Sequence, residues 1–201
     1  MSSVIPPGLD NRGVLSRFAS GGDTKDWLPY TKIKLYTNAF IVKDNKVLLG
    51  FKKRGFGKGK YNGFGGKVDP GETSLQAAVR ELQEESGVTA PLEHAGTLFF
   101  VSEGEDWAFE IEIYRADSYE GDITESDEMR PEWFSTVGVL DGDSQSSTIP
   151  FSKMWESDIV WFPYLISKRK FAGRADFTRE GDEFRLHRWW YGTVSDSSSE
   201  Q

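Results

Sequence analysis

One segment constrains the fold of this chain more than any other, a helix predicted over residues 73–86. Thr73 and Gln76 match a capping box at its start, and Gly87 stands where a left-handed residue ends many helices. Apolar residues recur with helical spacing and form a single stripe along it: Leu75, Ala78, Val79 and Leu82. The segment is therefore well specified as an amphipathic helix.

The same helix carries three glutamates, Glu81, Glu84 and Glu85, which span roughly 100° of its circumference from the edge of the apolar stripe. Like charges at i and i+4 destabilise a helix by about 0.2–0.5 kcal/mol, and these lie near the end where the helix dipole disfavours anions. A bound cation would offset both costs. Taken alone, the three glutamates are better explained as a solvated acidic face.

The residues around the helix reverse that interpretation. Gly66, Glu72 and the run 80–88 have the spacing of the Nudix box, and the chain resembles the Nudix hydrolases at every specified position of that signature. In that family the box is a loop–helix–loop whose glutamates bind a divalent metal at a diphosphate linkage. The resemblance assigns Arg80 and Glu72 to bracing the loop–helix junction. It implies that three residues are metal ligands or bases: Glu81, Glu84 and Glu85.

A glycine-rich stretch over residues 54–67 precedes the helix. It lacks the Gly-Lys-Ser/Thr ending of a P-loop, and no strand–glycine–helix unit with a later ribose-binding acid fits a Rossmann turn. Glycines allow close backbone approach, and nearby lysines suit a triphosphate. We favour Lys52 and Lys67 as phosphate contacts, whereas Lys58 and Lys60 are as well explained as solvated side chains.

Within the family, residues 35–189 look most like the animal MutT homologues, which hydrolyse oxidised purine nucleoside triphosphates. The segments that carry this resemblance are 49–57, 61–68, 125–131, 149–151, 154–155, 158, 161–163 and 168–171. By position, the resemblance implies a substrate site made of Thr37, Lys52, Phe56, Asn62, Phe64, Gly65, Gly66, Lys67, Phe100, Met129, Trp155, Ser157, Asp158 and Trp161. It also adds Glu128 and the Gly65 carbonyl to the metal site, which is expected to take Mg²⁺ with Mn²⁺ as a substitute.

These residue types suit a purine, because a tryptophan face stacks on a flat heterocycle and an amide or carboxylate supplies directional hydrogen bonds. Where the animal enzymes have two adjacent aspartates, this chain has Ser157 followed by Asp158. A serine hydroxyl cannot become anionic. We therefore hypothesise a preference of roughly tenfold for 8-oxo-dGTP over 2-oxo-dATP, with a plain N-cap role for Ser157 as the alternative.

Composition restricts the partners. The formal net charge is −8, which disfavours long nucleic acid as a partner, and a divalent cation would reconcile an acidic site with an anionic nucleotide. The chain has no cysteine, so disulfide scaffolds, thiolate nucleophiles and cysteine-bound zinc are excluded. No run of 18 apolar residues suggests a membrane span. We expect a cytoplasmic monomer, with the nucleus or the mitochondrion as other compartments.

The remaining pattern consists mostly of strands, with one early and one late helix. Strands are predicted over 35–42, 46–49, 97–102, 107–116, 174–179 and 183–190, and the second helix over 157–170 with Pro163 inside it. This order indicates an α+β class, and the resemblance implies a Nudix fold, an α/β/α sandwich around a mixed β-sheet. Residues 1–30 are predicted as a poorly ordered leader, 31–192 as the hydrolase domain with a polar loop insertion at 141–148, and 193–201 as a disordered tail.

The resemblance implies magnesium-dependent hydrolysis of the α–β linkage, giving monophosphate and pyrophosphate and sanitising the nucleotide pool. One of the catalytic carboxylates has to orient or deprotonate the attacking water, and the residues leave open which one. The candidate carboxylates are those of Glu81, Glu84, Glu85 and Glu128. Two alternatives stay open, a Nudix hydrolase of dinucleoside polyphosphates or other nucleotide diphosphate derivatives, and a Nudix module that binds nucleotides without catalysis.

Overall fold

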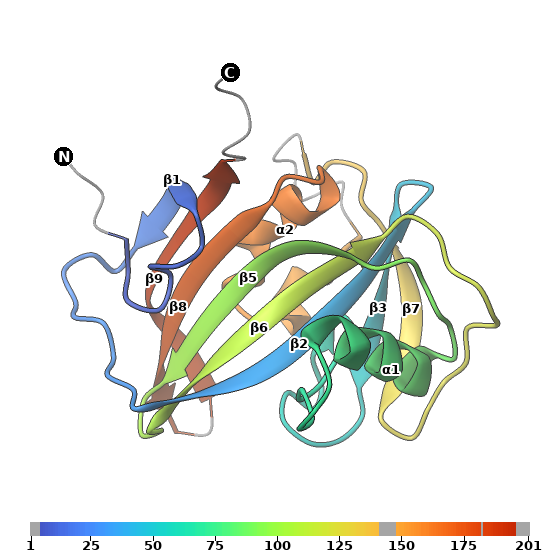
Figure 1. Ribbon diagram of the computed structural model, residues 1–201, viewed down its shortest axis with the longest axis horizontal. Coiled ribbons are helices and arrows are strands. Elements are labelled where there is room, and N and C mark those ends of the chain that lie inside the picture. Colours follow the sequence, from blue (N-terminus) through green and yellow to red (C-terminus); the bar gives the residue numbers. More distant parts are fainter. Residues whose placement is uncertain (1–4, 141–147, 182, 196–201) are drawn as a thin grey trace.

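The computed structural model describes residues 5–140, 148–181 and 183–195. Within these residues nine strands form one sheet in the order β1-β9-β8-β5-β6-β2-β3-β4, with β7 paired to β3 (Figure 1). The strands are β1 (Val14–Gly21), β2 (Lys32–Lys43), β3 (Lys46–Lys52), β4 (Tyr61–Asn62), β5 (Glu93–Ser102), β6 (Trp107–Ala116), β7 (Met129–Ser135), β8 (Phe171–Glu180) and β9 (Glu183–Ser195). The helices are α1 (Ser74–Ser86), α2 (Asp158–Ile166) and a short 3-10 helix, η1 (Phe151–Lys153).

The sheet is mixed, because β2 pairs in parallel with β6 and β5 with β8, while the other pairs are antiparallel. Its two faces are covered by different helices. Ala39 and Ile41 of β2 pack in the cluster under α1, whereas Phe40 and Val42 of the same strand pack in the cluster under α2. This alternation confirms the predicted α+β sandwich around a mixed sheet. In the part of the chain that is described, no helix is long and apolar enough to cross a membrane.

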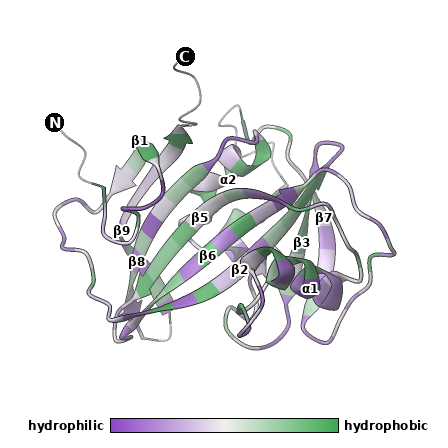
Figure 2. Cartoon of the chain, in the orientation of Figure 1, coloured by the Kyte–Doolittle hydropathy of each residue, from purple (hydrophilic) through white to green (hydrophobic). Residues whose placement is uncertain are grey.

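Helix α1 has the predicted ends. The Thr73 side chain accepts a hydrogen bond from the Gln76 backbone N–H, the Gln76 side chain accepts one from Thr73, and Gly87 has a φ of 79°. Its outer surface is largely hydrophilic (Figure 2). The apolar stripe is narrower than predicted, because Leu75 is exposed while Ala78 and Leu82 are fully buried.

The prediction of a poorly ordered leader is wrong for residues 5–30. Strand β1 pairs antiparallel with β9, and Leu9 is fully buried against the face of β5 and β8. Arg174 of β8 donates hydrogen bonds to two leader carbonyls, at Pro7 and Leu28. The prediction relied on the composition of the leader. The observed pairings join segments more than 140 residues apart, so no local sequence pattern indicates them.

The late helix is shorter than predicted, since it ends at Ile166 rather than at residue 170. Lys168 has a left-handed φ of 59°, which stops the helix and turns the chain into β8. Ser157 occupies the N-cap position, but its side chain makes no capping hydrogen bond.

The predicted strands are all present, most of them longer than expected, while the sequence does not predict β1, β4 and β7. Residues 193–195 belong to β9, so the predicted tail is wrong there. The rest of that tail, 196–201, and most of the predicted loop insertion, 141–147, lie outside the described residues.

Candidate active site

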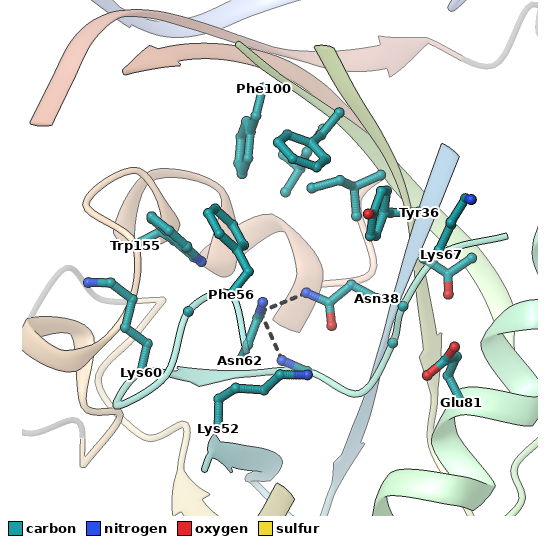
Figure 3. Close-up of a pocket in the computed structure, with 18 of the residues that line it drawn as sticks. Tyr36, Asn38, Lys52, Phe56, Lys60, Asn62, Lys67, Glu81, Phe100 and Trp155 are labelled. Atoms are coloured by element: carbon teal, nitrogen blue, oxygen red, sulfur yellow. Dashed lines mark hydrogen bonds between the residues drawn. The ribbon is translucent and has the colours of Figure 1, made fainter. Parts of the chain in front are cut away.

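A cavity of about 420 Å³ opens between β2, β5 and β6, the loop before β4, and the start of α2. Figure 3 shows Glu81 on one side of it and Trp155 on the opposite side, with Asn62 and Asn38 between them. Acidic side chains of α1 and aromatic side chains around α2 therefore share one cavity, although they lie 70 or more residues apart in the sequence.

Most of the predicted site residues lie in the wall of this cavity: Thr37, Lys52, Phe56, Asn62, Gly65, Gly66, Lys67, Glu81, Glu85, Phe100, Glu128, Met129, Trp155, Asp158 and Trp161. Three predicted residues do not. Phe64 is fully buried in the core beneath α1, and the Glu84 side chain is mostly exposed. Ser157 is fully buried outside the wall, near Tyr191, whose pKa is raised by burial, an effect that the Ser157 hydroxyl opposes. The structure therefore gives no support to base reading by Ser157.

The acidic end is built around Glu85, which is only 4% exposed. Its Oε2 accepts a hydrogen bond from the Gly65 backbone N–H at 2.9 Å, and its Oε1 lies 3.2 Å from Lys52 Nζ. Burial raises the pKa of Glu85 to about 7, although Lys52 and the Gly65 N–H lower it. Lys52 also contacts Glu128 at 2.6 Å, so a single ammonium group bridges two carboxylates.

Arg80 organises the other glutamates. Its guanidinium contacts Glu72 at 2.7 Å, Glu81 at 2.8 Å and Glu84 at 3.4 Å. The ion pair between Arg80 and Glu72 links α1 to the loop before it, which agrees with the bracing role that the resemblance implies for these two residues. Burial raises the pKa of Glu81, with Arg80 as the main opposing effect.

The donor set fits a divalent cation by its chemistry, because carboxylate and carbonyl oxygens are the ligands that Mg²⁺ prefers. As the side chains lie, no three acidic or histidine residues of the described ranges are close enough to hold an ion together. In this arrangement Lys52 pairs with Glu128 and Arg80 pairs with Glu81. Gly66 keeps space for this end of the site, since a Cβ there would lie 2.5 Å from Glu81 Oε1.

At the other end, Asp158 is buried at the start of α2. Its carboxylate accepts hydrogen bonds from the Trp155 backbone N–H at 3.1 Å and from the Trp161 indole at 3.2 Å. Burial raises the pKa of Asp158 to about 7. The Trp155 ring stacks on Phe56 with centroids 5.3 Å apart, and Lys60 Nζ lies 5.1 Å from the Trp155 centroid.

Sequence reasoning missed ten lining residues: Tyr36, Asn38, Gly57, Lys60, Gly63, Leu98, Ser102, Phe109, Ile111 and Phe177. Some of these residues could have been predicted from the alternation of side chains along the strands. Alternate residues of β5 and β6 point to one face, so Phe100 on β5 implies Leu98 and Ser102, while Phe109 and Ile111 follow from β6. For Asn38 and Lys60 the chain offers no such local signal.

Residues 33–164 match the family model of the NUDIX domain, which covers more than half of the chain. The chain belongs to the Nudix family. The oxidized purine nucleoside triphosphate hydrolase of Danio rerio is 50% identical over 145 residues, covering 72% of this chain and 86% of that protein. The hydrolase of the same name from Mus musculus is 44% identical over the same coverage.

Among solved structures, the MutT protein from Bacillus halodurans superposes on this Nudix chain with a TM-score of 0.63. It is 27% identical, and the match covers 79% of this chain and 97% of that one. The predicted Nudix fold and family are therefore confirmed. Nudix hydrolases generally use divalent metal ions such as Mg²⁺.

Proposed function

We propose that this protein hydrolyses oxidised purine nucleoside triphosphates to the monophosphate and pyrophosphate, with Mg²⁺ as the metal. The observation that carries the proposal is the shared cavity, which joins an aromatic pocket with a buried carboxyl group to a cluster of acidic and basic residues. A purine triphosphate needs both ends at once. The names of the Danio rerio and Mus musculus relatives support the same substrate class.

Magnesium supplies charge neutralisation at the phosphates when it is bound. The residues proposed to hold it are Glu81, Glu84, Glu85, Glu128 and the Gly65 carbonyl. Lys52 and Arg80 would release the carboxylates they now pair with. Lys52, whose Nζ lies between Glu85 and Glu128, is then free to contact the phosphates. One carboxylate of this set is proposed to orient or deprotonate the attacking water.

The aromatic end is proposed to hold the base. Trp155 and Phe56 offer flat faces for stacking, and Asp158 offers a carboxyl group that exists in both protonation states near neutral pH. The substrate is proposed to be a free nucleotide, the working form a monomer, and the place of action the cytoplasmic nucleotide pool, with the nuclear and mitochondrial pools as extensions.

The test is product analysis. The protein is incubated with Mg²⁺ and, separately, 8-oxo-dGTP, 2-oxo-dATP, dGTP and a dinucleoside polyphosphate, and the phosphorus products are resolved by NMR. We expect monophosphate and pyrophosphate from 8-oxo-dGTP, at a kcat/KM above that for dGTP. Release of inorganic phosphate, preferential cleavage of the dinucleoside polyphosphate, or binding without turnover would contradict the proposal and favour the alternatives.

A further inference from the structure

Two asparagines lie side by side in the middle of the cavity wall, between the phosphate end and the aromatic end (Figure 3). Asn62 belongs to β4 and Asn38 to β2, so their contact joins two strands that are not neighbours in the sheet. Asn62 is half-buried, whereas Asn38 is 7% exposed.

The orientation of the Asn62 carboxamide is set by its neighbours. Its Oδ1 accepts a hydrogen bond from the Gly63 backbone N–H at 2.9 Å, and a backbone N–H can only donate. The same oxygen accepts a second hydrogen bond from Asn38 Nδ2 at 2.6 Å. Both lone pairs of the Asn62 oxygen are therefore used by the protein.

What remains on Asn62 is the Nδ2 group, which has two N–H donors and makes no hydrogen bond to the described residues. The Asn38 oxygen has no partner among those residues and is sealed against Gly63, where a Cβ would lie 2.3 Å from it. Asn38 thus influences the cavity through the hydrogen bond that its Nδ2 donates to Asn62. The Asn38 Oδ1 atom, its hydrogen-bond acceptor, lies against Gly63.

We propose that Asn38 is a positioning residue for substrate recognition, which locks the Asn62 carboxamide so that it presents only N–H donors to the ligand. The atom of the nucleotide that meets Asn62 is then a hydrogen-bond acceptor, a carbonyl oxygen or an unprotonated ring nitrogen. A ligand that presents an N–H group at this point is rejected, because two donors face each other. The inference rests on the proposed function and adds a selection rule to it.

The test uses two substitutions of nearly unchanged size. Asn38→Leu removes the hydrogen bond from residue 38 to Asn62 but leaves the hydrogen bond from the Gly63 N–H to Asn62. Asn38→Asp replaces the N–H donor by an acceptor, which favours the rotated Asn62 amide and turns its oxygen toward the ligand. Asn45→Asp, at the exposed turn between β2 and β3, adds the same charge outside the cavity as a matched control.

Dissociation constants for 8-oxo-dGMP are measured by calorimetry, which needs no turnover, and melting temperatures check folding. We expect about a tenfold weaker Kd for Asn38→Leu, and a larger loss for Asn38→Asp although it is the closer isostere. For 8-oxo-dGTP the KM should rise while kcat stays within about threefold. Asn45→Asp should bind like the wild type. A Kd within twofold of wild type in both cavity variants overturns the inference.

A spectroscopic measurement on the unaltered protein keeps the inference testable should a variant fail to fold. In side-chain amide NMR spectra, the Asn38 NH₂ protons should exchange slowly in the free protein, and the Asn62 NH₂ signals should shift when 8-oxo-dGMP is added. Fast exchange at Asn38, or an Asn62 signal that does not respond to bound nucleotide, overturns the inference. If the wild type binds no oxidised purine nucleotide at all, the proposed function itself fails, which is a different outcome.

Discussion

Two buried carboxyl groups, Glu85 and Asp158, set the chemistry of the two ends of the cavity. Burial raises the pKa of each to about 7. Their surroundings differ, because Glu85 lies next to the ammonium group of Lys52, whereas the hydrogen bonds that Asp158 accepts from the described residues come from neutral N–H groups. The environment of Glu85 suits replacement of the Lys52 ammonium group by a metal cation. The environment of Asp158 suits a directional hydrogen bond to a nucleotide base.

Glu85→Gln should lower kcat for 8-oxo-dGTP by at least about 100-fold, because one carboxylate that stabilises charge in the transition state is lost. The fold should persist, since glutamine can still accept the Gly65 hydrogen bond. Steady-state kinetics at saturating Mg²⁺ check this, with the exposed Glu93→Gln as control. Residual activity above a tenth of wild type would remove Glu85 from the metal site.

Asp158 should make the protein less stable as the pH rises. Its pKa is raised from 3.8 to about 7 on folding, so between these values the folded state keeps a proton that the unfolded chain releases. This group then costs about 1.4 kcal/mol of unfolding free energy for each pH unit between pH 4 and 7. Asp158→Asn should remove that slope.

Urea unfolding of wild type and Asp158→Asn at pH 4.5, 5.5, 6.5 and 7.5 measures the difference. The stability of the variant relative to the wild type should increase from pH 4.5 to 6.5 and level off by pH 7.5. If the two profiles run parallel, Asp158 titrates near its ordinary pKa and burial does not control it.

At the scale of elements, the leader acts as a structural part of the sheet. Residues 5–30 lie on the same face of the sheet as α1, over the part formed by β5, β8 and β9 that α1 does not reach, and β1 extends the sheet past β9 (Figure 1). Leu9 and Leu15 supply the buried leucines of this cover. The segment completes the fold without contributing a residue to the cavity wall.

Leu9→Ala should therefore lower the unfolding free energy by about 2–5 kcal/mol, the usual cost of truncating a fully buried leucine. The kcat should change less than twofold, because Leu9 is remote from the cavity wall. Val14→Ala in β1, where the side chain is 68% exposed, is the control and should cost less than about 0.5 kcal/mol. Equal stability of Leu9→Ala and wild type would show that the leader does not pack as described.

At the scale of the whole molecule, a buried ion pair connects the leader to the sheet. Arg174 and Asp176 on β8 are fully buried and 2.8 Å apart, and the Asp176 carboxylate accepts a hydrogen bond from the Leu28 backbone N–H. The Arg174 guanidinium also lies against the rings of Trp27, Tyr30 and Phe99. Its charge is thus balanced by one carboxylate, two leader carbonyls and three aromatic faces.

Arg174→Met should destabilise the protein by about 3–5 kcal/mol, because it leaves the Asp176 carboxylate buried without its partner. The double variant Arg174→Met, Asp176→Leu should recover much of that loss, since no buried charge remains. Chemical denaturation of the two variants and the wild type tests this. A double variant no more stable than Arg174→Met would mean that the leader contacts, rather than the unpaired charge, dominate.

The α1 helix and its glutamates could be predicted because their signals are local. A capping box, a left-handed glycine and a 3.6-residue period all lie within about four turns of chain, so neighbouring residues determine the structure. Glu81 and Glu85 reach the cavity because the helix geometry places them on one arc. Gly66 and Arg80 followed from the same motif, together with its spacing.

The tertiary structure alone decided the rest. Asn38 faces Asn62 only because β2 and β4 are brought together across β3, and Ser157 is withdrawn from the cavity by the way α2 packs beside Tyr191. The leader became part of the sheet through the β1–β9 pairing. Contacts between residues far apart in the chain depend on how whole strands assemble, and a local stretch of sequence carries no signal of its distant partner.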